Sequence, residues 1–160
     1  MSKLIDEELS AFLSSHVSLH LSCVTSSLRT SIVRCVGARV DNVKQKISLL
    51  IPGSQAREII EHIGRKTAVA VVFTDPETYR SIQIKSNNAT IETSVASDVQ
   101  LHQDYIKKFT ERLRVYNIPP SYVHTLCYCQ SADLQVITLS PQQLYDQSPG
   151  RLAGTLLGTI

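Results

Sequence analysis

Alternation of apolar and polar residues along the chain predicts a protein built mainly from β-strands. Residues 68–73 (AVAVVF) form an unbroken apolar run, as expected of a strand that is buried on both faces. Residues 81–85 (SIQIK) alternate strictly, so that Ile82 and Ile84 share one face of a strand. Turn-forming residues separate these two runs from a third at residues 89–95. The three segments together predict an antiparallel meander.

Four further segments show the same strand pattern. They are residues 17–23, 31–40, 46–51 and 134–139. The linkers between the first three are short, which favours hairpins over crossover connections. We therefore expect a mainly β protein with peripheral α-helices, and specifically a small antiparallel barrel.

Apolar side chains at helical spacing predict three helices around this barrel. The first begins near the N-terminus, with Ser2 as a possible cap, and the second runs over residues 54–63 with Ser54 as its N-cap. The third runs from residue 98 to about residue 116, with Ser97 as its cap. Residues 122–128 leave a short helix open, and the chain from residue 147 onward reads as a loose tail.

Size and charge narrow the class of protein. A chain of 160 residues fits one domain, 1–160, and its net charge of +2 is too small to indicate nucleic-acid binding. The N-terminus is acidic where a signal peptide is basic, and no apolar run reaches the ~20 residues of a membrane span. Four cysteines without disulfide or zinc spacing favour reduced thiols, so we expect a cytoplasmic protein that binds no metal.

Arg34 is the first residue that suggests chemistry. It shares a predicted strand face with Ile32 and Val36, and an unpaired buried guanidinium costs several kcal/mol. Three interpretations stay open. Arg34 pairs with a carboxylate such as Glu92, or its side chain extends its charged end into solvent at the end of the strand. Alternatively, it binds an anionic ligand such as a phosphate, which arginine grips with two N–H groups.

The strand-to-helix turn Gly53-Ser54-Gln55 is the second such feature. Free N–H groups at a helix start attract anions, and Arg57 places a cation in the first turn of the predicted helix. If neighbouring strands aim Arg34 at the same point, the two features would hold a single phosphate.

The order of these motifs resembles that of the pyridoxamine 5'-phosphate oxidase-like, FMN-binding split-barrel family. The matching segments are SIVRCVGAR at 31–39, ISLLIPGSQA at 47–56 and TYRSIQIKS at 78–86, together with a Pro-Gly-x-x-Ala-Gly ending at 149–154. In the family's oxidases, a strand that begins with arginine and ends with lysine, with four hydrophobic residues between them, precedes a Gly-Ser-Arg-Lys turn. Aligning Ser54 with the serine of that turn places Arg34 and Arg39 on the arginine and lysine of the strand without a gap. The resemblance covers about half of the chain and its tail.

The resemblance implies a split barrel that binds FMN between the two subunits of a homodimer. Arg34 and Ser54 would hold the phosphate, the backbone near Val36 and Gly37 would flank the ring, and Ser81 or Gln83 would bond its heteroatoms. Tyr79 and Arg80 would reach the groove or cover its rim. The expected cofactor-binding residues are Arg34, Val36, Gly37, Arg39, Leu49, Leu50, Ser54, Gln55, Arg57, Ser81 and Gln83.

Departures from the family pattern limit the function that the resemblance implies. Gln55 and Ala56 replace the Arg-Lys pair, and the arginine-rich C-terminal segment of the oxidases is missing. These differences argue against vitamin B6 phosphate oxidation and leave an FMN-dependent oxidoreductase acting on a small organic substrate. A flavin-binding sensor without turnover, an interaction module that has lost flavin, and haem or a deazaflavin in place of FMN stay open.

Overall fold

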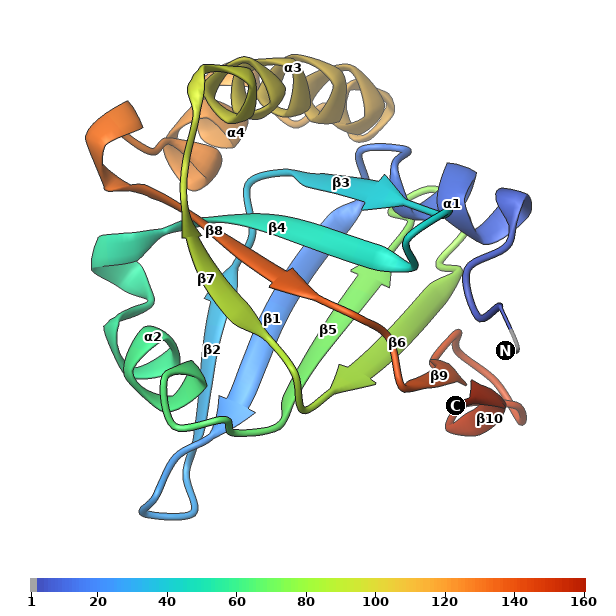
Figure 1. The fold of residues 1–160 in the computed structure, drawn as a ribbon. Coiled ribbons are helices and arrows are strands. Elements are labelled where there is room, and N and C mark those ends of the chain that lie inside the picture. The colour runs from blue at the N-terminus through green and yellow to red at the C-terminus, as the bar shows by residue number, and fades with distance from the viewer. Residues whose placement is uncertain (1–2) are drawn as a thin grey trace.

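Two antiparallel β-sheets face each other across an apolar core in the computed structural model, which describes residues 3–160 (Figure 1). The six-stranded sheet has the order β10-β9-β6-β5-β1-β2 and the four-stranded sheet the order β3-β4-β8-β7. The predicted architecture, a mainly β split barrel with peripheral helices, is confirmed. The strands are β1 (Ser18–Val24), β2 (Thr30–Arg34), β3 (Ala38–Asp41), β4 (Lys46–Pro52), β5 (Val69–Thr74), β6 (Ser81–Ser86), β7 (Thr90–Thr93), β8 (Leu134–Leu139), β9 (Gln143–Asp146) and β10 (Thr155–Thr159).

Helices lie around the edges of this barrel (Figure 1). The long helix α3 crosses one end of it, and α4 packs against α3. None of the helices within residues 3–160 is both long enough and apolar enough to cross a membrane. The helices are α1 (Glu7–Leu13), α2 (Arg57–Ile63), α3 (Ala96–Leu113) and α4 (Pro120–Cys127), with 3₁₀ turns η1 (Gly53–Gln55), η2 (Arg114–Tyr116) and η3 (Ser131–Asp133).

The helix starts differ from those predicted. Asp6 caps α1 by accepting the N–H of Leu9 at 2.8 Å, whereas Ser2 lies outside the described residues. Helix α3 begins at Ala96 because the Asp98 carboxylate accepts the N–H of Val95 at 3.0 Å. In both cases a carboxylate caps the helix in place of the predicted serine.

The six-stranded sheet is packed on one face only. Strand β5 alternates between buried and half-buried residues, so the prediction that this apolar run is buried on both faces is wrong. Its inner face contributes Val71 and Phe73 to the core, while the outer face carries Val72 between His20 and Gln83 of the neighbouring strands. This uncovered outer face is where ligand-binding groups can lie.

The segment predicted as one strand over residues 31–40 is two strands in different sheets. Between β2 and β3 the chain crosses from one sheet to the other, where Val36 N–H donates to Leu50 O at 2.8 Å and Leu50 N–H donates to Gly37 O at 2.9 Å. A Cβ on Gly37 would lie 3.0 Å from Leu50 Cδ1, and the φ of Gly37 is +154°. Glycine is therefore required at this crossing.

Two other strand predictions also fail at the level of pairing. Strand β7 pairs with β8 in the four-stranded sheet, so the predicted meander ends at β6. The predicted loose tail from residue 147 instead contains strand β10. It pairs with β9, which was not predicted, and the two extend the six-stranded sheet beyond β6.

Candidate functional site

Arg34 lies at the end of β2, directly opposite His20 on β1. Its side chain is half-buried, and its Nη1 donates to Ser18 Oγ at 3.2 Å. Within residues 3–160 no carboxylate lies within ion-pair distance of it, so the predicted alternative of a salt bridge to Glu92 is wrong. Arg34 is thus a partly desolvated cation that donates to the neutral hydroxyl of Ser18.

A row of side chains crosses the outer face of the six-stranded sheet from Arg34. The strand registers place Arg34, His20, Val72 and Gln83 side by side on β2, β1, β5 and β6. Three strand spacings put the backbones of Arg34 and Gln83 about 14 Å apart. The row therefore offers a cation at one end, a largely apolar middle and an amide at the other end.

A groove of about 500 Å³ opens beside this row, between the sheet and the end of α3. Burial lowers the pKa of His20, and the neighbouring Arg34 guanidinium lowers it further. His20 is therefore neutral at pH 7 and leaves Arg34 as the cation of the row. The lining residues are Ser18, His20, Thr74, Pro76, Tyr79, Leu113, Tyr116 and Ile118.

Ser81 and Gln83 face this outer surface from β6. Ser81 is buried, and its hydroxyl lies 3.0 Å from Thr74 Oγ1 and donates to Tyr79 O at 3.1 Å. Gln83 is half-buried, and its Oε1 accepts a hydrogen bond from Gln147 Nε2 at 3.2 Å. Both lie on the same sheet face as Arg34, as their predicted common role requires.

The Ser54 turn has a different partner. The N–H of Ser54 donates to Asp133 Oδ1 at 2.8 Å, and its hydroxyl donates to Asp133 Oδ2 at 2.6 Å. A carboxylate thus occupies the donors that were predicted to hold a phosphate. Ser54 caps no helix, because α2 begins only at Arg57, and the adjoining Gln55 is exposed.

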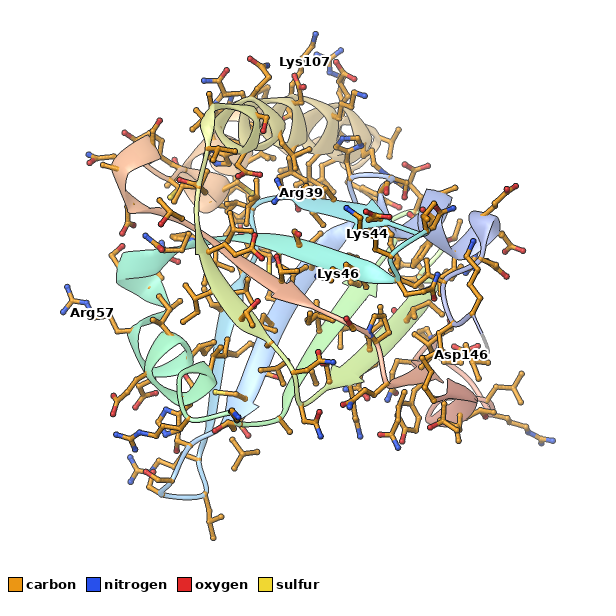
Figure 2. The ribbon with its side chains drawn as sticks, in the orientation of Figure 1. Arg39, Lys44, Lys46, Arg57, Lys107 and Asp146 are labelled. Atoms are coloured by element: carbon orange, nitrogen blue, oxygen red, sulfur yellow. The ribbon has the colours of Figure 1, made fainter. Side chains whose placement is uncertain are left out.

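The other predicted cations are also separated from Arg34. Figure 2 shows Arg57 pointing from α2 away from the body of the protein, on the far side from α1, whereas Arg39 lies below α3. Arg39 forms an ion pair with the buried carboxylate of Asp98. The predicted convergence of Arg34 and the Ser54 turn on one point is not seen, since their hydrogen bonds go to different partners.

The apolar residues predicted to bind the cofactor belong to the core. Val36, Leu49 and Leu50 are almost completely buried by protein atoms. Gly37 lies against the Leu50 side chain at the crossing between the sheets. In the single chain these four positions pack the protein and open onto no groove described above.

The cysteines contribute no nucleophile at neutral pH. Burial raises the pKa of Cys35 to about 12 and that of Cys129 to about 11, and it also raises the pKa of Cys23 and Cys127. Nowhere in residues 3–160 do three or more His, Cys, Asp or Glu side chains gather as metal ligands would.

Sequence reasoning did not assign the groove residues Ser18, His20 and Thr74 to the site. Ser18 and His20 occupy the polar positions of an alternating strand, which is the signal that could have placed them on the same outer face. The contribution of Leu113, Tyr116 and Ile118 had no such signal, because it depends on how α3 packs across the end of the barrel.

No protein-family model matches the chain, and no curated protein sequence does either. Solved structures do match it over most of its length. An F420 reductase is 15% identical, with a TM-score of 0.57 and coverage of 88% of this chain and 98% of that one. A pyridoxamine 5'-phosphate oxidase-related, FMN binding protein from Nostoc punctiforme is 13% identical, with a TM-score of 0.53 and coverage of 94% and 89%.

HutZ, the heme storage protein from Vibrio cholerae, is also similar, with 17% identity, a TM-score of 0.50 and coverage of 88% of this chain and 93% of that one. At these identities the shared property is the arrangement of strands and helices. The chain has the split-barrel fold of the pyridoxamine 5'-phosphate oxidase-like, FMN-binding proteins.

Proposed function

We propose that the protein binds FMN on the outer face of its six-stranded sheet, with the flavin phosphate at Arg34. The observation that carries the proposal is the half-buried guanidinium of Arg34, which has a serine hydroxyl and no carboxylate as its partner within residues 3–160. A partly desolvated cation gains from an anionic partner, and arginine matches the geometry of phosphate.

The row that starts at Arg34 suits the rest of the cofactor. Val72 and the neutral ring of His20 offer a surface for a flat molecule. Ser81 and Gln83 offer hydroxyl and amide groups for the heteroatoms of the flavin ring. The Ser54 turn does not fit the phosphate, because its donors are already held by Asp133.

The proposed activity is that of a flavin-dependent oxidoreductase acting on a small organic substrate. Bound FMN supplies reversible electron transfer, and the chain contributes binding and orientation. Arg34 neutralises the phosphate, while Gln83 and Ser81 orient the ring against the sheet. Haem and deazaflavins also carry anionic groups that Arg34 can bind, so the identity of the released cofactor is part of the test.

The outer face that would hold FMN is also the proposed interface of a homodimer. Ile32, next to Arg34 on this face, is 63% exposed, and Leu156 at the far end of the same sheet is 49% exposed. Pairing two copies over this face would cover these side chains and enclose the flavin between the subunits.

A second candidate function is that of an interaction module that has lost flavin. The observation in its favour is that two predicted cofactor-binding groups already have carboxylate partners. Asp133 holds Ser54, and Asp98 holds Arg39. On this alternative Arg34 would bind an anionic group of a partner protein.

The absorbance spectrum of the purified protein, with mass spectrometry of what denaturation releases, separates these functions. We expect a flavin spectrum that is bleached by NADH or NADPH and restored in air. Flavin absorbance without bleaching would support cofactor binding and contradict this electron donor. Absence of bound flavin, together with failure to take up added FMN, would favour the interaction module.

Two variants test the assignment of the phosphate. Arg34→Ala removes a charged hydrogen bond, so we expect FMN affinity to fall by about 1.5–3 kcal/mol, measured by flavin fluorescence titration. Ser54→Ala is the matched control and should bind FMN as the wild type does, because Ser54 is bound to Asp133. Loss of affinity in the Ser54 variant alone would reverse the assignment.

A further inference from the structure

Two exposed tyrosines border the groove beside Arg34. Tyr79, on the loop between β5 and β6, is 61% exposed, and Tyr116, in η2 after α3, is 44% exposed. Leu113 and Ile118 complete this side of the groove with aliphatic surface. Aromatic rings exposed in this way offer large faces for a ligand.

The backbone of Tyr79 is strained. Its φ is +61°, in the left-handed region where a bulky side chain is rarely found. The conformation is held because Tyr79 N–H donates to Asp75 O at 2.9 Å and Tyr79 O accepts from Ser81 Oγ at 3.1 Å. Strain that is maintained around an exposed aromatic ring indicates a function for the position of that ring.

Arg112 of α3 fixes the same loop. Its Nη2 donates to Asp75 Oδ1 at 2.6 Å, its Nη1 donates to Ser15 O at 2.7 Å, and its Nε lies 3.1 Å from Glu77 Oε1. The loop is tied to η2 as well, since Tyr116 donates its hydroxyl hydrogen to Pro76 O at 2.8 Å. The backbone of Tyr79 and the side chain of Tyr116 are therefore held in position before any ligand arrives.

The charges around the groove favour an uncharged ligand. Arg112 pairs with the two carboxylates of the loop, Asp75 and Glu77. Arg34 is assigned to the flavin phosphate, and His20 is neutral. The Tyr79 hydroxyl makes no hydrogen bond with the part of the chain that the structure describes, so it can donate to a ligand oxygen.

We infer that Tyr79 and Tyr116 form a subsite for a planar, uncharged aromatic ring that carries a hydrogen-bond acceptor. Ring faces pack against the tyrosines and the aliphatic side chains, and the free Tyr79 hydroxyl bonds the acceptor. This ring belongs to the organic substrate that meets the flavin, an assignment that rests on the proposed function. Arg112 is a positioning residue, because it acts through the loop that carries Tyr79.

Coumarin, a flat neutral molecule with a carbonyl acceptor, is a suitable probe. Its binding is measured by equilibrium dialysis with flavin-free protein and with FMN-loaded protein, and 2-decalone serves as a non-planar competitor of similar size. Tyr79→Gly removes the ring and suits a positive φ, so the variant should fold. We expect it to weaken coumarin binding about three- to tenfold, as the loss of an aromatic contact does.

Tyr128→Ala is the matched control, because Tyr128 is 62% exposed but follows the C-terminal end of α4, away from the groove. It should bind coumarin as the wild type does, and Tyr79→Phe should retain the stacking part of the affinity. Equal binding by the Tyr79→Gly and Tyr128→Ala variants, or equal competition by 2-decalone, would overturn the inference.

The same measurements distinguish a failure of the proposed flavin binding from a failure of the proposed tyrosine subsite. A protein that takes up no FMN but binds coumarin in a Tyr79-dependent manner would keep the subsite and refute the flavin assignment. A protein that binds FMN but shows no Tyr79 dependence would keep the flavin and refute the subsite. Arg34→Ala should lower FMN affinity while leaving coumarin binding to the flavin-free protein unchanged.

Discussion

At the residue scale, the partner of each cation decides whether it is available to a ligand. Arg34 and Arg39 are five residues apart and were both predicted to bind the cofactor, yet Arg39 is paired with Asp98, whereas Arg34 donates to the neutral hydroxyl of Ser18. A paired guanidinium gives up little free energy to bind a second anion, because its charge is already compensated. Arg34 is for this reason the better candidate of the two.

Asp98 has two roles that substitution can separate. Its carboxylate is almost completely buried, forms the ion pair with Arg39 and accepts the N–H of Val95 at the start of α3. Asp98→Asn removes the charge and keeps an acceptor, whereas Asp98→Ala removes both. We expect both variants to be less stable to urea than the wild type, with the alanine variant lower by about a further 1 kcal/mol.

Asp104 provides the control on the same helix. It is exposed and, within residues 3–160, accepts a hydrogen bond only from Gln100 one helical turn earlier, at 3.2 Å, so Asp104→Ala should change the free energy of unfolding by less than about 0.5 kcal/mol. Equal stability of the alanine and asparagine variants at Asp98 would show that the cap contributes nothing.

At the scale of elements, sequence pattern located most strands but not their partners. Period-two alternation reports which side chains share a face, and it located β1, β4, β6 and β8 to within a residue or so. It contains no information on which strand lies alongside. That is why the crossing at Gly37 and the pairing of β7 with β8 were missed.

The same limit applies to the predicted cofactor-binding residues. The partner of Ser54 is Asp133, 79 residues away, and the partner of Arg39 is Asp98, 59 residues away. Neither pairing follows from local spacing, because each depends on how separate elements pack. Arg34 could be singled out from its own position alone, since an arginine among strand residues needs an explanation.

The loop between β5 and β6 depends on a charged contact that acid should weaken. Burial raises the pKa of Asp75, but the N–H of Glu77 and the Arg112 guanidinium outweigh it and hold the pKa below its usual value. A carboxylate with a lowered native pKa stabilises the fold fully above its unfolded pKa of about 3.9, and this contribution is lost as the pH falls through the native value.

Arg112→Met tests this contact, since methionine keeps much of the buried stem. At pH 7 we expect the variant to lose about 1.5–3 kcal/mol of stability, the range for a charged hydrogen bond. The difference from the wild type should shrink at pH 3 and below, without vanishing, because Arg112 also donates to Ser15 O. Urea unfolding of both proteins at pH 7, 5 and 3 measures this difference in stability. A difference that stays constant with pH would show that the contact between Arg112 and Asp75 does not cause it.

At the scale of the whole molecule, the outer face of the six-stranded sheet is the surface that the fold leaves uncovered. It combines the Arg34 row, the groove and the exposed side chains of Ile32 and Leu156. Apolar side chains gathered around a charged row are typical of a surface that another molecule covers. The proposed homodimer and the proposed flavin site use this same face, so one should depend on the other.

Ile32→Lys tests that dependence. The lysine would put two like charges into a two-fold interface, so we expect a dimer that becomes monomeric in light scattering after gel filtration, with weaker FMN binding as the second subunit is lost. Val43→Lys is the control, because Val43 is 85% exposed in the turn between β3 and β4 of the other sheet. If the wild type is already monomeric, the proposed interface is refuted. If the Ile32→Lys variant stays dimeric, the interface lies on another face. If a monomeric variant still binds FMN, the whole cofactor site lies within one chain.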